Sequence, residues 1–414
     1  MRTYLIMAIR NLRRHKKRSM MTGIMIGVAA LTMLLTLAFS QSIAAKMTDS
    51  IVRNYTGNIQ IHAPVRGEIQ VFMAAADDTP FLKDSRRILQ IARRERDVYE
   101  ASPRLRLQGL LSNGEDAMGI TAIGIDSKRE RKVSPKIKVV KGSYLTHGKG
   151  ILLAKKVAQY FDARIGQEFV IVTTTPDGYT NGISLQLAGI VSAEGMEAFF
   201  DDTLVYMDIH AARRLLYLNR QEVSEVVLAL KEGAAEERVI PALEKAYRAG
   251  GLRVRLDRWQ DVAGMLSGIL MAGVMLPQMA LVILLIVVAF GISNTILMAV
   301  LERTPEIGTM MALGAKRREI ITLFMVETAT LGAIAAGIGC LIGAGIIYYL
   351  SRVGIPATVE ALEFIFGGKR FYFIFSWTGI AVSFGGIVFF SALVTALPAR
   401  LATRFNPVEA LRQV

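Results

Sequence analysis

Cysteine and histidine are almost missing from this chain of 414 residues. Cys340 is the one cysteine, which excludes disulfide bonds within the chain and zinc sites built from several cysteine ligands. The four histidines, His15, His62, His147 and His210, do not have the spacing of metal ligands. We therefore expect no metal, no other cofactor and no catalytic residues.

Signatures of nucleotide and nucleic-acid binding are also lacking. The segment 142–150, GSYLTHGKG, is only superficially like a phosphate-binding loop, because its spacer is one residue too long and no Ser or Thr follows the lysine. Residues 44–273 hold 32 basic and 28 acidic residues, so most of the net charge of +14 lies elsewhere. That distribution indicates membrane topology rather than a nucleic-acid partner, and any ATP would be bound by a partner subunit.

Charged residues make up only 20% of the chain and hydrophobic residues 52%. Four apolar runs reach the roughly 20 residues that a helix needs to cross a bilayer. The sequence predicts a four-helix transmembrane bundle with a large α+β extracytoplasmic domain inserted between spans one and two. The expected parts are a cytoplasmic basic amphipathic segment (1–19), spans at 20–43, 274–300, 320–350 and 373–397, the extracytoplasmic domain (44–273), a cytoplasmic helix (301–319), an outer loop (351–372) and a cytoplasmic tail (398–414).

Basic residues set the expected orientation. Residues 1–19 carry seven Lys or Arg and no acid, which favours a cytoplasmic N-terminus, and the basic tail favours a cytoplasmic C-terminus. A cleaved signal peptide is the competing interpretation, since Ser42–Ala44 offers small residues after the first apolar run.

The segment 44–273 has no run of span length, so we expect it to fold in water. Short β-rich stretches bounded by Gly, Asp and Pro predict strands at 105–111, 117–125, 169–174, 183–191 and 223–230. Helical patterns cover 80–94, 210–218 and 234–249.

A short charged helix is expected between spans two and three. Thr304 is the predicted N-cap and Pro305 suits the first helical position, while Glu306 faces the positive end of the helix dipole. Gly314 is expected to end this helix in a left-handed conformation.

Several stretches in and around this helix carry a family resemblance. They are Asn294-Thr295, Val300–Thr304, Glu306-Ile307-Gly308 and Ala312–Ala315. They resemble the signature of FtsX-domain ABC permeases, a superfamily with MacB-like and LolC/LolE-like proteins. The resemblance implies a coupling helix that contacts a cytoplasmic ABC ATPase subunit. The implied contact residues are Glu302, Arg303, Glu306, Ile307, Gly308, Gly314, Lys316 and Arg317. Pro305 departs from the family, which more often has a basic residue there.

Span three is rich in glycine, and the spacing of Gly339 and Gly343 lets two helix backbones approach closely. We expect a second permease copy, identical or homologous, to pack at this face. Glu327 lies about two turns into the span, where an ionised group needs a partner or water. It is interpreted either as a coupling residue or as an interfacial carboxylate near Arg318.

The resemblance implies a transporter permease of the bacterial inner membrane, without enzymatic activity of its own. Gly57–His62 looks like lipoprotein-release permeases of the LolC/LolE type, and a lipoprotein or other envelope molecule is the expected substrate. Two alternatives stay open: MacB-type export of drugs or peptides, and FtsX-like regulation of an envelope hydrolase.

Overall fold

The computed structural model describes Arg10 and residues 16–64, 80–146, 150–193 and 202–402. Contacts divide the chain into two compact units. The helical unit comprises residues 1–42, 272–355 and 372–414, and the sheet unit comprises 43–271 and 356–371. Most of the basic segment 1–19, most of the tail 398–414 and His147 lie outside the described residues.

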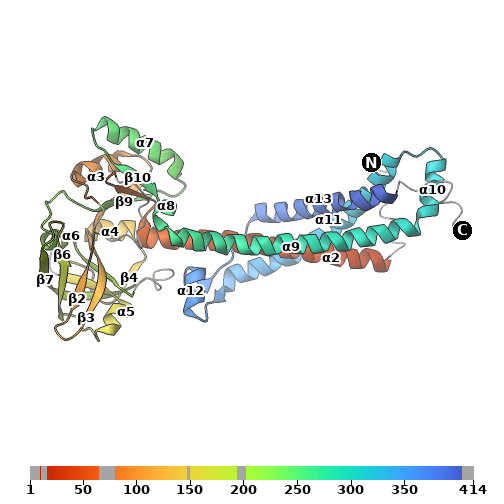
Figure 1. Ribbon diagram of the computed structural model, residues 1–414. Coiled ribbons are helices and arrows are strands. Elements are labelled where there is room, and N and C mark those ends of the chain that lie inside the picture. The colour runs from red at the N-terminus through yellow and green to blue at the C-terminus, as the bar shows by residue number, and fades with distance from the viewer. Residues whose placement is uncertain (1–9, 11–15, 65–79, 147–149, 194–201, 403–414) are drawn as a thin grey trace. The chain divides into compact units, whose positions relative to one another are not determined.

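Four long helices form the helical unit (Figure 1). They are α2 (Lys16–Ile51), α9 (Met265–Glu302), α11 (Arg317–Val353) and α13 (Trp377–Ala402). Each is long and apolar enough to cross a membrane, as the sequence predicted, and this makes the chain a membrane protein. α2 and α9 have 36 and 38 residues, roughly 55 Å of helix, against a hydrocarbon core of about 30 Å.

The first two helices therefore extend beyond the expected spans. α2 runs without a break through Ser42–Ala44 and continues as the π-helical segment η1 (Val52–Thr56). Its last turns are packed inside the sheet unit, where Ile43 and Met47 are buried. α9 likewise continues without a break through Pro277.

Close backbone packing joins α2 to α11. A Cβ atom added at Gly339 would lie 2.2 Å from the carbonyl oxygen of Gly27, and one added at Gly343 would lie 3.0 Å from Leu34. The glycine face of span three is thus occupied by the first helix of the same chain.

A ten-stranded mixed sheet forms the sheet unit, in the order β10-β1-β9-β2-β3-β8-β5-β7-β4 with β6 paired to β2 and β7. Its strands are β1 (Ile59–His62), β2 (Val98–Ser112), β3 (Ala117–Ile125), β4 (Ile137–Gly142), β5 (Gly150–Ala154), β6 (Glu168–Thr174), β7 (Thr180–Ala193), β8 (Leu204–Asp208), β9 (Glu225–Leu230) and β10 (Arg255–Arg258). The five predicted strands are all present.

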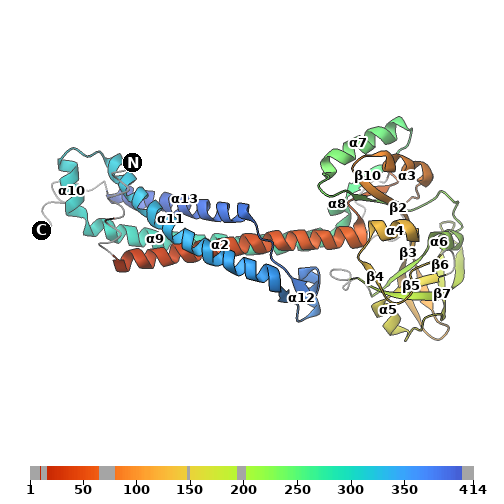
Figure 2. The same ribbon diagram turned by 180° about the vertical axis from the view of Figure 1, so that it is seen from behind.

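Short helices cover this sheet, as Figures 1 and 2 show. They are α3 (Ser85–Arg94), α4 (Ser127–Val133), α5 (Lys155–Tyr160), α6 (Ile209–Leu215), α7 (Glu236–Ala249) and α8 (Trp259–Ala263). α3, α6 and α7 were predicted. One hydrophobic core runs through the unit, with Leu105, Phe169 and Leu243 among its fully buried side chains.

The expected outer loop 351–372 contains structure of its own. It includes the two-stranded ribbon of β11 (Ile355–Pro356) and β12 (Arg370–Phe371) and the helix α12 (Glu360–Phe366). Residues 356–371 belong to the sheet unit rather than to a separate loop, in part because Gly367 packs against the backbone of Lys46.

The two strands nearest the first two membrane helices are neighbours. β1 follows η1 after two residues, β10 precedes α8, and the two strands pair antiparallel with Ile59 opposite Arg258. Gly57 makes the turn into β1 at φ +64°, and a Cβ there would lie 2.3 Å from Val227. The strands that continue into the membrane helices thus lie side by side at the edge of the sheet.

Replacing Gly339 by Ala tests the close packing of α2 and α11. The added methyl group must push Gly27 away, so we expect a loss of about 1–3 kcal/mol in unfolding free energy, measured on the full chain in detergent. Gly345→Ala on the same helix is the control, because nothing lies within 4 Å of its Cβ position. Equal stability of the two variants would contradict this packing.

Candidate functional site

A short helix, α10 (Thr304–Ala312), follows α9 and lies at one end of the helical unit (Figure 1). Pro305 occupies its first turn, where the missing N–H of proline breaks no helical hydrogen bond. The prediction of Thr304 as N-cap is wrong. Its hydroxyl donates instead to the carbonyl oxygen of Val300 at 3.1 Å, so Thr304 completes the end of α9 and Arg303 is the N-cap residue.

A Schellman motif ends α10. The backbone N–H of Ala315 donates to the carbonyl oxygen of Met310 at 3.0 Å, and that of Gly314 donates to Met311 at 3.1 Å. Gly314 has φ +100°, the left-handed conformation that the sequence predicted. The motif fixes where the chain leaves α10 before α11 begins at Arg317.

Ile307 anchors α10 to the ends of three long helices. Its side chain is 5% exposed and belongs to one buried cluster with Val300 of α9, Phe324 of α11 and Ala399 of α13. Gly308, the next residue, is also buried. Because the cluster joins α10 to three helices, a displacement of α10 would disturb the packing of all three.

Two ion pairs lie beside this cluster. Arg303 Nη1 is 3.1 Å from Glu327 Oε2, and its Nη2 donates to Glu327 Oε1 at 3.4 Å, with both side chains about nine-tenths buried. Arg18 of α2 is 2.7 Å from the carboxylate of Glu302 at the end of α9. The expected neighbour of Glu327 was Arg318; the ion pair is made with Arg303, which satisfies the carboxylate inside the protein.

The structure divides the eight implied contact residues into two groups. The exposed residues are Glu302, Glu306, Gly314, Lys316 and Arg317, and the buried residues are Arg303, Ile307 and Gly308. The buried group holds α10 in place and offers little surface to a partner. Leu313, which sequence reasoning did not single out, is 85% exposed at the end of α10. Its only signal in the sequence was its place in the stretch Ala312–Ala315.

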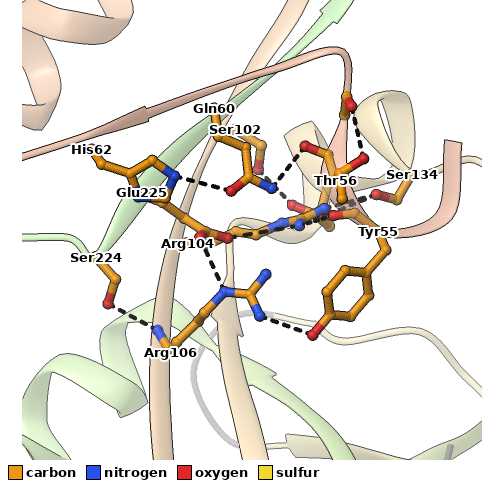
Figure 3. A network of polar contacts seen from close by, with 12 residues as sticks. Tyr55, Thr56, Gln60, His62, Ser102, Arg104, Arg106, Ser134, Ser224 and Glu225 are labelled. Carbon is orange, nitrogen blue, oxygen red and sulfur yellow. Dashed lines mark hydrogen bonds and ion pairs between the residues drawn. The ribbon is translucent and has the colours of Figure 1, made fainter. Parts of the chain in front are cut away.

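A second polar site lies inside the sheet unit, where β2 carries arginines into the interior (Figure 3). Arg104 Nη2 and Nε donate to Glu130 Oε1 of α4 at 2.5 and 3.1 Å, and the two side chains are 3% and 0% exposed. The hydroxyls of Ser102 and Ser134 donate to the same carboxylate at 2.7 and 3.0 Å. These additional bonds compensate for the cost of burying the ion pair.

The same arginines hold the last turn of the first helix. Arg104 Nη1 donates to the backbone carbonyl oxygen of Tyr55 in η1, where the helix dipole is negative. Arg106 Nη1 donates to the Tyr55 hydroxyl at 2.8 Å, and its guanidinium lies 4.9 Å from the ring centroid. The side chain and the main chain of Tyr55 are therefore both bound to β2.

Glu225 connects this network to β9. Its Oε2 accepts a hydrogen bond from Arg106 Nε at 3.0 Å (Figure 3). Burial acts to raise the pKa of Glu225, but the charges of Arg106 and Arg104 hold that pKa below its ordinary value. Glu225 is consequently ionised at neutral pH.

His62 is a structural residue of β1. Burial lowers its pKa below the ordinary value, although Glu225 and Asp257 act in the opposite direction, so the imidazole is neutral at pH 7. Its Nε2 lies 3.1 Å from Gln60 Oε1, and the Gln60 amide donates to the carbonyl oxygen of Thr56 at 2.9 Å. The network therefore binds η1 to β1 as well as to β2 and α4.

Within the ranges that the structure describes, no three His, Cys, Asp or Glu side chains are grouped to hold a metal ion. Each of the two sites fixes a helix end to several other elements.

Glu130→Gln tests the energetic weight of the buried network. It leaves Arg104 buried without its main carboxylate, so we expect a loss of about 3–5 kcal/mol in unfolding free energy of the full chain. Glu115→Gln, at an exposed turn, is the control and should change stability by no more than about 0.5 kcal/mol.

A milder variant covers the case in which Glu130→Gln does not fold. Ser134→Ala removes one hydroxyl that contacts both members of the pair and should cost about 1 kcal/mol. If both variants matched Glu115→Gln, the network would contribute nothing to stability.

Two family models match the chain. The MacB-like periplasmic core domain matches residues 20–246, and the FtsX-like permease C-terminal model matches residues 279–407. The first covers more than half of the chain.

Similar proteins include the macrolide export ATP-binding/permease protein MacB of Psychrobacter arcticus, which is 24% identical over 98% of this chain and 58% of its own. An uncharacterized ABC transporter permease of Methanocaldococcus jannaschii is 28% identical over 55% of this chain and 54% of its own. The chain thus spans little more than half the length of these relatives. The periplasmic region of MacB from Actinobacillus actinomycetemcomitans aligns with 52% of this chain and 94% of its own, at 11% identity and a TM-score of 0.37. On the family-model matches, the chain belongs to the MacB-like family of ABC transporter permeases.

Proposed function

We propose that this permease transmits the ATP-driven movement of a cytoplasmic ABC ATPase subunit to the sheet unit, which lies on the outer side of the bacterial inner membrane. The observation that carries the proposal is the packing of α10. Its inner face, through Ile307, belongs to a cluster shared with three long helices, and its end exposes Leu313. Force applied to this one helix would reach the whole bundle.

The exposed residues of α10 and its flanks have the chemistry of a docking site. Leu313 offers an apolar side chain, and acidic and basic groups surround it in sequence at Glu306, Lys316 and Arg317. Apolar anchors flanked by charges supply affinity and orientation at protein interfaces. We assign this surface to the ATPase, with ATP bound by that partner.

Movement would reach the sheet unit through α2 and α9, two unbroken helices. α2 continues through η1 into β1, whereas α8 and Gly264 separate α9 from the neighbouring strand β10. The arginine network fastens η1 to β2. A tilt of α2 would therefore turn the sheet as one body instead of bending the connection at η1. This supports mechanical transmission, in which no substrate has to pass through the four helices.

For the substrate, the relatives favour MacB-type export over lipoprotein release. The lipoprotein interpretation rested on Gly57–His62. Packing within the sheet unit now explains why these residue types occur at these positions. Gly57 needs its positive φ and has no space for a side chain, and Gln60 and His62 belong to the buried network. Lipoprotein release stays a prediction, and release of a lipoprotein from vesicles containing the assembled transporter would reverse the preference.

A second permease copy remains part of the proposal. Because Gly339 packs against Gly27 of the same chain, that copy would pack at another face of the bundle. The alternative of an FtsX-like regulator has no observation in its favour beyond the shared C-terminal family model.

Reversing the charge of Glu306 tests the docking surface. If Glu306 meets a basic group of the ATPase, Glu306→Lys would place two positive charges against each other, and we expect at least about tenfold weaker ATPase binding together with loss of transport. Insertion and stability should not change, because Glu306 is exposed. ATPase pull-down, transport and membrane levels are the measurements.

Glu115→Lys, the same substitution at an exposed turn of the sheet unit, is the matched control. Glu302→Lys reports in addition on the pair with Arg18. Normal ATPase binding and transport in both Glu306→Lys and Glu302→Lys would refute a coupling role for α10.

A further inference from the structure

A groove of about 1030 Å³ opens within the sheet unit. It is lined by α3, α4 and α6, by Pro103 of β2 and by the segment that precedes β9. Sites for small molecules typically measure about 300–1,000 Å³. The groove is therefore large enough for a chain segment, and the proposed function makes no use of it.

Arginines dominate the lining of this groove. Five of them come from α3, α4, α6 and the segment before β9: Arg86, Arg93, Arg129, Arg213 and Arg220. Asp126 is the one carboxylate among the lining residues. The groove therefore attracts anions, and guanidinium groups are suited to bind carboxylates through two parallel hydrogen bonds.

Only some of these charges are neutralised within the protein. Arg93 is paired with Glu100, and Arg129 Nε lies 3.3 Å from Asp126 Oδ2. In the part of the chain that the structure describes, neither Arg86 nor Arg220 forms an ion pair, and both are exposed. Two charges at the groove are thus available to a ligand.

Arg213 adds a third charge to the lining of the groove. The residue is 9% exposed, and its Nε donates to the backbone carbonyl oxygen of Glu222 at 3.2 Å. Burial lowers its pKa by more than the nearby Asp208 and Asp126 raise it. Its positive charge is thus incompletely compensated, and an anion in the groove would stabilise it.

The remaining lining distinguishes among anions. Gln90 and Gln221 present amide groups that both donate and accept hydrogen bonds, as a peptide backbone requires. Leu89, Pro103 and Ile209 are the apolar residues of the lining, and each is largely buried. We propose that this groove binds an acidic peptide segment, with carboxylates on the arginines and backbone amides on the glutamines. A phosphate polymer would use the arginines and leave the amide and apolar groups without partners.

This site goes beyond the proposed coupling function and does not depend on it. Binding needs neither ATP nor the ATPase, so the two proposals can fail separately.

The test measures binding of a fluorescein-labelled dodecapeptide of alternating Glu and Ala to the full chain in detergent. We expect the Glu peptide to bind, and a peptide with Gln in place of Glu to bind at least about tenfold more weakly. The double variant Arg86→Gln/Arg220→Gln should weaken the Glu peptide by about tenfold or more. Arg87→Gln should leave it unchanged, because Arg87 is an exposed neighbour on α3 that does not line the groove.

Two outcomes would overturn the proposal. Equal weakening by Arg87→Gln and the double variant would mean attraction to diffuse surface charge. Binding of inorganic polyphosphate without binding of the Glu peptide would mean that the groove selects phosphate.

Discussion

The buried contact of Arg104 with Glu130 and with the Tyr55 carbonyl oxygen is the interaction on which the sheet unit depends. One guanidinium binds a carboxylate from α4, a hydroxyl and the end of the helix that leaves the membrane. Removing any partner would leave a charge or a helix carbonyl unpaired in the interior, where such groups are costly. The geometry at the end of α2 is therefore tightly constrained, and side chains of β2 and β9 reinforce it.

The contacts that hold α10 and η1 to neighbouring elements differ in their chemistry. At α10 the joint is apolar: one isoleucine is packed among the ends of three helices, with the Arg303–Glu327 pair beside it. At η1 the contacts are polar, and they come from side chains of the sheet strands β1 and β2. Apolar packing tolerates small movements of neighbouring helices, whereas a network of directional hydrogen bonds permits little movement of the groups that it joins. The proposed function, in which the helices shift and the sheet moves as one body, agrees with this difference between the two sets of contacts.

Much of the fold could be predicted because its signals are local. The span-length helices follow from long apolar runs, and β3 was predicted at Ala117–Ile125, as observed. Strand β2 shows the limit: Arg104 and Arg106 alternate with leucines, which indicates a strand with one face in water, yet Arg104 is 2% exposed. Its partners come from α4, β9 and η1, far apart in the sequence. For the same reason the close-packing face at Gly339 could be predicted, but not that α2 occupies it.

The measurement closest to the central claim is the distance between nitroxide labels at Ala45, near the C-terminal end of α2, and Glu115, at the β2–β3 turn, in a Cys340→Ala background. Both positions are exposed and belong to the sheet unit, and Cys340 is the native cysteine that must be removed. In the complex with its ATPase, the account predicts one narrow distance distribution that is the same with ATP and with ADP. A distribution that broadens or shifts with the nucleotide would mean that α2 moves against the sheet, and the joint would not transmit motion as described.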